Sequence, residues 1–444
     1  MDAAEISSGD TAWVLTSAAL VLLMTLGLSF FYGGMVRAKS VLNMVMMSIV
    51  SMGIVGVVWV LFGFSMVFGD SIGGFVGNPF DFAGLTALLG ETAVVGTVPA
   101  LVFVGFQAAF AIIAVALVSG AVADRMRFSA WVVFAAVWAV LVYFPAAHWV
   151  FAVDGLVSES GGFIANDFGA IDFAGGTAIH INAGAAALVL AVILGPRIGL
   201  QRSPMRPHSL PLVMLGAGLL WFGWFGFNAG SALAADHVAA HAWVTTLAAP
   251  AAGMLAWLVV ERIRDGRPTS LGAASGVVAG LVGITPAAAA VSPMGALAIG
   301  AVSGVGSALA IGLKKKLGYD DSLDVVGVHL VAGLIGTLSI GFLADPDAPA
   351  ESAGLLYGGG FELLGVEALS SVVVLCYSII MTTLIALVLR RLMGGLRVSA
   401  REESFGIDVA AHAESGYDYS QTPLTAPGIT RSVVIPAPVQ QEVN

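Results

Sequence analysis

The stretch "GGTAIHINAGAAALVLAVIL", residues 175–194, is long and apolar enough to cross a lipid bilayer as a single helix. It nevertheless contains His180. Because removing an ionisable side chain from water costs several kcal/mol, a histidine inside a membrane span indicates a functional site. The alternative is a histidine that packs between helices and donates to a backbone carbonyl, and this residue alone does not decide between the two.

The whole chain has the composition of an integral membrane protein. Hydrophobic residues make up 58% of it and charged residues 10%, whereas an ordinary soluble domain carries about 25% charged residues. Its apolar runs are about 20 or more residues long, as membrane helices require, and do not alternate like barrel strands. We therefore predict an all-α polytopic protein in a lipid bilayer, with no nucleic acid partner. The single cysteine, Cys376, allows no disulfide or zinc cluster within the chain.

Apolar runs bounded by charges or turn residues predict eleven membrane spans. They cover residues 12–35, 40–68, 98–122, 129–150, 172–194, 210–234, 239–260, 271–290, 292–313, 324–343 and 365–392. The eighth and ninth spans are separated only by the two prolines of "GITPAAAAVSPMG", which indicate a tight turn. We expect residues 1–392 to form the transmembrane domain, 393–420 a cytoplasmic regulatory region and 421–444 a disordered tail.

The basic residues support this count, because each of them follows an odd-numbered span or lies in the tail. They are Arg37, Lys39, Arg125, Arg127, Arg197, Arg202, Arg206, Arg262, Arg264, Arg267, Lys314, Lys315, Lys316, Arg390, Arg391, Arg397, Arg401 and Arg431. We expect the protein to lie in the plasma membrane. The positive-inside rule then places its N-terminus outside the cell and its C-terminus in the cytoplasm. The opposite face carries only acidic charges, which either attract an external cation or simply keep the outer loops soluble.

A short repeat links the fifth and tenth spans. The fifth contains "HINAG" from His180, and the tenth contains "HLVAG" from His329. The two motifs are five spans apart, which is an odd number, so the two halves of the chain would lie in opposite senses across the bilayer. These halves cover about residues 12–194 and 210–343, and residues 365–392 form an additional helix. Such inverted repeats place a substrate path between them, where the two imidazoles could hydrogen-bond and form a proton relay.

The residues along this path favour a small neutral molecule inside the membrane and a cation outside it. No basic residue within a span offers an anion site, and the spans hold too few acids for a permanent alkali-cation cage. Aromatic faces bind cations and a hydroxyl can accept from an N–H, although core packing would equally explain such residues. The candidate outer residues are Phe106, Phe110, Phe151, Phe227 and Ser231. Recruitment of a cation followed by neutral transit is the chemistry of ammonium and ammonia.

Five motifs together resemble the ammonium transporter family (Amt), which is related to the Rhesus proteins. They are "FYGGMVRAKSVLN", "FQAAFAI", "DFAGGTAIHINAG", "WFGFNAGSA" and "DVVGVHLVAG", and the resemblance extends to about residue 419. It implies eleven spans, a homotrimer with one path per subunit, no cofactor, and His180 and His329 as twin pore histidines. It also implies a stacked outer gate of Phe110 and Phe227. The external ammonium site would consist of Phe106, Phe110, Phe151 and Ser231.

Two positions qualify this resemblance. Asp172 matches the family's aspartate at the head of the fifth span, but capping that helix could be its entire role. The family usually closes its external cation site with a tryptophan, where "PAAHWVF" has Phe151. Because tryptophan is the better cation–π partner, the site would be weaker unless Trp149 takes over.

The resemblance predicts an ammonium transporter that recruits ammonium, removes its proton and conducts ammonia past the histidines. Whether the proton crosses through the histidine pair or returns outside stays open at this point. The rivals are an ammonium sensor on the same scaffold, acting through the cytoplasmic tail, and a transporter of another solute. The segment after the last span resembles the family's C-terminal region, which meets a PII-type signalling protein in many prokaryotic members. An enzyme is not expected, and His148 beside Trp149 is interpreted as an interfacial anchor.

Overall fold

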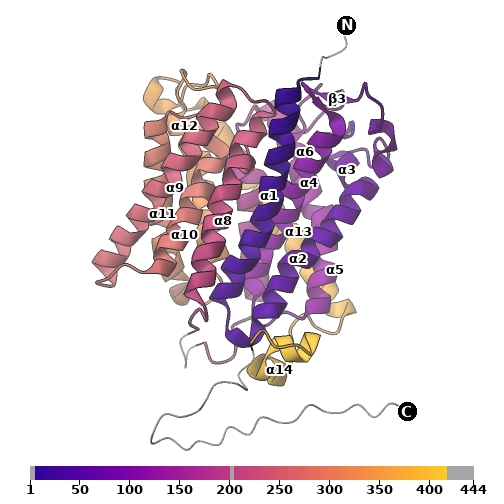
Figure 1. Cartoon of the computed structure of the whole chain (residues 1–444). Coiled ribbons are helices and arrows are strands. Elements are labelled where there is room, and N and C mark those ends of the chain that lie inside the picture. The colour runs from indigo at the N-terminus through magenta and orange to yellow at the C-terminus, as the bar shows by residue number, and fades with distance from the viewer. Residues whose placement is uncertain (1–5, 201–204, 418–444) are drawn as a thin grey trace, which may run out of the picture.

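The protein is a bundle of long helices that lie side by side and are joined by loops at both ends (Figure 1). The computed structural model describes residues 6–200 and 205–417. Within these ranges eleven helical segments are long and apolar enough to cross a membrane, which confirms the predicted number of spans. Their bounds differ from the prediction by only a few residues, and the predicted tail 421–444 lies outside the described part of the chain.

Several spans consist of an α-helix joined to a short 3-10 or π-helical turn, marked η. The first half comprises α1 (Ser8–Met35), η1 (Ala38–Ser40), α2 (Val41–Val58), η2 (Trp59–Gly63), α3 (Phe64–Phe68), α4 (Ala100–Val118), η4 (Ser119–Val122), α5 (Phe128–Trp138), η5 (Ala139–Tyr143), α6 (Phe144–Phe151), η7 (Gly176–Ile181) and α7 (Asn182–Leu194). The second comprises α8 (Leu210–Ala229), η8 (Gly230–Ala232), α9 (His237–Arg264), α10 (Ser270–Ile284), η9 (Thr285–Ala287), α11 (Pro293–Leu317), η10 (Val326–Val331), α12 (Ala332–Leu343) and α13 (Glu362–Leu392). α14 (Ala400–Phe405) and η12 (Asp408–His412) follow.

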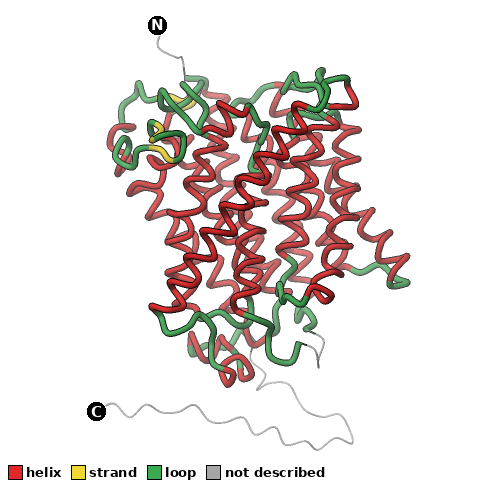
Figure 2. Tube along the Cα trace, turned by 180° about the vertical axis from the view of Figure 1, so that it is seen from behind, coloured by secondary structure: helices red, strands yellow, loops and turns green. Residues whose placement is uncertain are grey.

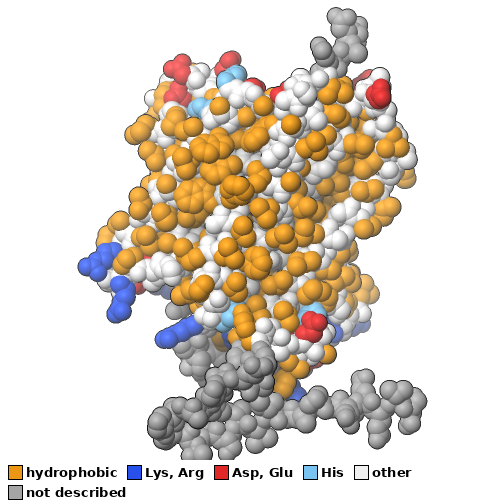
Figure 3. All heavy atoms as spheres, viewed as in Figure 1, with side chains coloured by type: hydrophobic (Ala, Val, Ile, Leu, Met, Phe, Trp, Pro, Cys, Tyr) orange, Lys and Arg blue, Asp and Glu red, His pale blue; other side chains and the backbone are white. Residues whose placement is uncertain are grey.

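The two ends of the bundle differ. One end, which we call the hairpin end, carries the antiparallel pairs β1–β2 (Ser71–Ile72, Val76–Gly77) and β3–β4 (Val94–Val95, Val98–Pro99) and the loop turns η3 (Ala83–Leu88), η6 (Ile164–Phe168) and η11 (Leu355–Tyr357) (Figure 2). The other end is named the α14 end after its short helix. On the face shown in Figure 3, Lys and Arg side chains lie at the α14 end, and acidic side chains gather mainly at the hairpin end.

Helices α1 and α8 pack closely because glycines line their contact. A Cβ atom at Gly216 would lie 2.3 Å from the backbone nitrogen of Phe31, and one at Gly34 would lie 2.7 Å from the carbonyl oxygen of Ser209. Helices in lipid associate largely through such close backbone packing, since lipid tails are as apolar as leucine. α1 carries Phe31 and α8 carries Phe227, so this contact helps to position both sides of the path described below.

The segment after α13 packs against the α14 end of the bundle. A capping box of Ser399 and Glu402 begins α14, and the buried Glu403 accepts from the backbone N–H of Ile198 at 2.6 Å. Asp408 accepts from the backbone N–H groups of Leu42 and Asn43, at 3.0 and 2.8 Å. Ser40, at the N-cap of α2, provides no such bond through its own side chain, so Asp408 caps this helix from the other end of the sequence.

We expect Asp408→Ala to release this docked segment. The change leaves two N–H groups at the start of α2 without their acceptor, which should cost about 1 kcal/mol, the usual value of a helix cap. Hydrogen exchange at the first turn of α2 should accelerate, and limited proteolysis within 393–417 should become faster. Glu414→Ala, in the same segment, is the control and should change neither. Equal protection in both variants would show that the cap does not hold the segment.

Candidate functional site

The two histidines singled out in the sequence lie in contact in the middle of the bundle. The Nδ1 atoms of His180 and His329 are 3.3 Å apart, and their rings stack at 28° with centroids 5.2 Å apart. The side chains come from η7 and η10, two π-helical turns that each continue into a regular helix. Since two facing ring nitrogens bond only when one carries a proton, this pair shares one hydrogen and is uncharged or singly charged.

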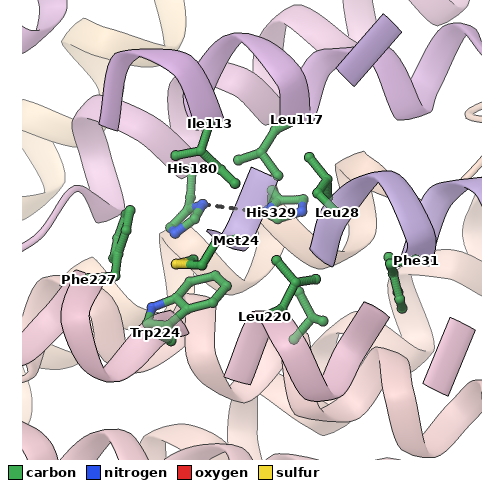
Figure 4. Close-up of a pocket in the computed structure, with 11 residues that line it drawn as sticks. Met24, Leu28, Phe31, Ile113, Leu117, His180, Leu220, Trp224, Phe227 and His329 are labelled. Atoms are coloured by element: carbon green, nitrogen blue, oxygen red, sulfur yellow. Dashed lines mark hydrogen bonds between the residues drawn. The ribbon is translucent and has the colours of Figure 1, made fainter. Parts of the chain in front are cut away.

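A narrow cavity runs beside this pair (Figure 4). Its volume is about 10 Å³, which is roughly the space that one water-sized molecule requires. The lining residues are Met24, Leu28, Phe31, Ile113, Leu117, His180, Leu220, Trp224, Phe227, Val278 and His329. The indole N–H of Trp224 donates to Thr285 at 2.8 Å, whereas Nε2 of His180 has no partner among the described residues. The cavity therefore offers imidazole nitrogen in a wall that is otherwise apolar.

A pair of stacked phenylalanines closes the cavity toward the hairpin end. The rings of Phe110 and Phe227 lie 4.2 Å apart at an angle of 7°, and both side chains are 1% exposed. Ile113 and Leu117 follow Phe110 along α4 and line the cavity, while the ring of Phe227 is 6.2 Å from that of His180. Aromatic packing at this distance leaves no space between the two rings.

The other predicted outer residues surround this stack. Phe106 lies 4.8 Å from Phe110, and Phe151 meets Phe110 edge to face at 6.4 Å and 90°. Phe151 and Ser231 are partly exposed, in contrast to the buried stack. The Ser231 hydroxyl donates to the carbonyl of Phe227 at 2.9 Å, so its oxygen can still accept a hydrogen bond from another donor. The structure thus combines aromatic faces and a hydroxyl acceptor on the hairpin side of the stack.

Trp149 and His148, which precede Phe151 in the sequence, make hydrogen bonds away from the phenylalanine stack. The indole N–H of Trp149 donates to the carbonyl of Phe75 at 2.7 Å, and its ring packs against Tyr377 at 4.5 Å. Trp149 therefore does not take the place of the family's tryptophan. The interpretation of His148 as an interfacial anchor is wrong, because its ring is fully buried between the carbonyl of Val67 and the hydroxyl of Ser71, at 2.6 and 2.8 Å.

Asp172 caps the turn that carries His180. Its Oδ1 accepts from the N–H groups of Gly175 and Gly176, both at 2.7 Å, and its Oδ2 accepts from those of Thr177 and Ala178, at 2.8 and 3.1 Å. Burial raises the pKa of this carboxyl, and the four N–H groups oppose that rise. All four bonds end on the histidine-bearing segment, so Asp172 fixes where η7 begins.

Two further buried carboxyls were not predicted. Glu367 of α13 accepts from the N–H of Ile171, next to Asp172, at 2.7 Å. Asp321 accepts from the N–H of Val326 at 2.7 Å and so caps the second histidine turn. The sequence held a signal for Asp321, since it precedes His329 by eight residues, as Asp172 precedes His180. Elsewhere in the ranges that the structure covers, no group of three or more His, Cys, Asp or Glu side chains is arranged to hold a metal ion.

The chain is similar to known proteins over nearly its whole length. The family model described as Ammonium Transporter Family matches residues 12–417. The ammonium transporter of Mycobacterium tuberculosis (strain H37Rv) is 60% identical over 433 residues, which cover 93% of this chain and 91% of that protein.

Solved structures show the same arrangement of helices. The chain is similar to the crystal structure of Saccharomyces cerevisiae Mep2, with a TM-score of 0.82 and 32% identity over 89% of each chain. A structure described as a sensor Amt protein has a TM-score of 0.83 and 30% identity, and covers 91% of this chain and 98% of its own. The likeness therefore includes about nine tenths of the chain.

Proposed function

The chain belongs to the ammonium transporter family, and from this premise we propose that it recruits ammonium, removes its proton and conducts ammonia along His180 and His329. The observation that carries the proposal is the imidazole pair, with one unpartnered ring nitrogen, in an apolar cavity about the size of one small molecule. Such a cavity rejects an ion that keeps its charge, because the imidazole nitrogens in an otherwise apolar wall are too few to replace the lost hydration. Ammonia carries no charge and can hydrogen-bond to imidazole.

Recruitment takes place on the hairpin side of the phenylalanine stack. The faces of Phe106, Phe110 and Phe151 attract a cation, and the Ser231 oxygen accepts one of its N–H groups. As the cation leaves water, its proton becomes easier to remove, and ammonia then passes the moving rings of Phe110 and Phe227. Potassium has a similar size but no proton to give up, so the same route excludes it.

The proton follows along the histidine pair in this proposal. The contact between the Nδ1 atoms of His180 and His329 allows one imidazole to donate to the other, which is the requirement for passing a proton. Transport is then electrogenic. The route runs from the hairpin end to the α14 end, which we assign to the cytoplasm from the positions of the basic residues.

The test is the current evoked by ammonium pulses across proteoliposomes that contain the purified protein. We expect a saturable current for ammonium and none for potassium. A pH dye inside the same vesicles distinguishes the alternatives if no current flows. Alkalinisation of the lumen faster than in protein-free vesicles means that ammonia crosses alone, whereas a silent dye would indicate a sensor.

The same proposal includes the assembly and its setting. We propose that the protein forms a homotrimer in the plasma membrane. Within each subunit, Asp172 acts as the cap of the first histidine turn. A PII-type signalling protein would bind at the α14 end, where α14 and η12 cover the connections between spans. The mass of the complex in detergent and pull-down with a purified PII protein test these two points.

Phe151→Trp should strengthen the external site. A tryptophan face binds cations better than phenylalanine, and about 1 kcal/mol of added attraction would lower the KM for ammonium roughly fivefold. The position is partly exposed and beside Phe110, so the larger ring has room toward the hairpin side. Current measured against ammonium concentration gives the KM. Phe75→Trp, on the neighbouring hairpin, is the control, and an equal change in both variants would contradict a specific role for Phe151.

A further inference from the structure

The two carboxyls that cap the histidine turns are not equivalent. Asp172 uses both oxygens, which together accept from four backbone N–H groups. Asp321 uses Oδ2 for the N–H of Val326, and its Oδ1 has no partner among the described residues, although the residue is only 1% exposed. The backbone N–H of Val325 also lowers the pKa of Asp321. Capping therefore accounts for both oxygens of Asp172, whereas Oδ1 of Asp321 is left without a hydrogen bond. A buried oxygen without a partner is costly to keep and calls for an explanation.

The positive charge nearby, that of Lys314, does not bind Oδ1 of Asp321. The ammonium group of Lys314 donates to the backbone carbonyl of Asp321 at 2.9 Å and pairs with the carboxylate of Asp324. Burial raises the pKa of Asp321 to about 6, the charge of Lys314 opposes that rise and Asp324 adds to it. The charged and titratable groups that face Asp321 are Lys314 of α11, Asp324 of the same loop, Arg125 after η4, Tyr319 after α11 and Tyr32 of α1. A carboxyl with this pKa can both accept and release a proton near neutral pH.

A chain of contacts leads from the cavity to this carboxyl. Leu117 lines the cavity, and its carbonyl accepts from the hydroxyl of Tyr32 at 3.0 Å. The ring of Tyr32 and the side chain of Val325 both lie against Gly120, since a Cβ there would be 2.6 and 2.7 Å from them. Val325 directly precedes the turn that Asp321 caps. The carboxyl thus lies behind the wall of the path, on its α14 side.

We propose that Asp321 is the proton-exchange group at the α14 end of the pore. Its carboxylate accepts the proton that has passed the histidine pair, and the resulting carboxylic acid releases it to water at that end. Eight residues separate Asp321 from His329, roughly 12 Å along a helix, so water carries the proton between them. In the first step an O–H bond forms at Oδ1 of Asp321 while an O–H bond of the protonated water molecule breaks. In the second step the O–H bond at Oδ1 breaks and the proton forms an O–H bond with a water molecule at the α14 end. No electrons are transferred, and the carboxylate is regenerated.

This inference rests on the proposed function, and its test separates the two. Asp321→Asn keeps an oxygen to cap Val326 but cannot take up a proton. We expect the ammonium-evoked current in proteoliposomes to fall about 100-fold, the usual contribution of a proton-transfer group. Ammonia should still enter and alkalinise the lumen faster than in protein-free vesicles. Asp236→Asn changes another capping aspartate in the same way, but at an exposed position at the hairpin end, and should leave the current unchanged.

The pH profile supplies a second readout that capping alone would not change. The wild-type current should fall as the pH on the α14 side drops below about 6, because the carboxyl is then already protonated. Asp321→Asn should lack this fall, and Asp321→Glu should restore part of the current. An unchanged current in Asp321→Asn, or loss of current and ammonia entry together, would overturn the proton-exchange role. A wild type that alkalinises the lumen without any current would also overturn it, whereas a silent wild type would refute the proposed function itself.

Discussion

Replacing both His180 and His329 with leucine should reduce the ammonium-evoked current about 100-fold. Leucine approximates the volume of imidazole but neither donates nor accepts a hydrogen bond. The transported molecule would then cross a cavity without any polar contact, and the loss of about 3 kcal/mol of hydrogen bonding corresponds to a factor of roughly 100. The proton would lose its path as well, because the contact between the two Nδ1 atoms no longer exists.

The measurement compares currents from equal amounts of reconstituted protein, with potassium pulses beside the ammonium pulses. His241→Leu is the matched control, because this histidine contacts the carbonyl of Val291 and does not line the cavity. It should transport like the wild type. If the double variant kept a full current that still excluded potassium, the histidines could not be the path of the proton.

Asp320→Ala should be the most destabilising of the single changes considered. Its carboxylate binds the guanidinium of Arg197 through two hydrogen bonds of 2.9 Å, and both side chains are almost completely buried. Removing Asp320 leaves the buried Arg197 with only the more distant carboxylate of Asp124, at 3.5 Å, and takes the nearest carboxylate from the buried Arg125. Breaking a buried ion pair in this way costs about 3–5 kcal/mol. We expect a clearly lower Tm in detergent. Replacing both residues with leucine should cost less than Asp320→Ala, because no buried charge of this pair is then left alone.

The pair also fixes the pH dependence of this stability. Burial alone would raise the pKa of Asp320, but the hydrogen bonds and charge of Arg197 outweigh it and lower the pKa below 3.8. The pair of Asp320 and Arg197 therefore stabilises the fold fully at pH values above 3.8, and this stabilisation is lost as the pH falls through the lowered pKa of Asp320. Asp265→Ala is the control, because the exposed pair of Arg264 and Asp265 is worth at most about 1 kcal/mol. Similar small changes of Tm in both variants would contradict the prediction.

The spans were predictable because each is a long apolar run, and such runs have few alternatives in lipid. The contact between His180 and His329 was predicted from the shared pattern H-x-x-A-G in the fifth and tenth spans, and the structure places the two rings together. The positions of Trp149 and His148 were not predictable. Both are covered by the loop that carries β1 and β2, through Phe75 and Ser71, and no periodicity in the sequence shows where a loop folds back.

The buried carboxyls illustrate a second limit. Glu367 and Ile171 are 196 positions apart, and their hydrogen bond depends on how α13 packs against η7. The π-helical turns at both histidines were not predictable either, because their residues fit a regular helix equally well. Composition thus reveals which segments enter the membrane, whereas the partners of polar groups inside it depend on tertiary packing.

The cap that Asp408 provides for α2 imposes an order on biosynthesis. The two partners are 366 residues apart, so at about 5–20 residues per second the ribosome needs roughly 20–70 s to make the second after the first. During that interval the second span is completed and the nine spans after it are synthesised, while the first turn of α2 lacks its acceptors. Insertion into the membrane and completion of the α14 end are therefore separate events. A nascent chain can occupy the bilayer before the surface at its α14 end exists in final form.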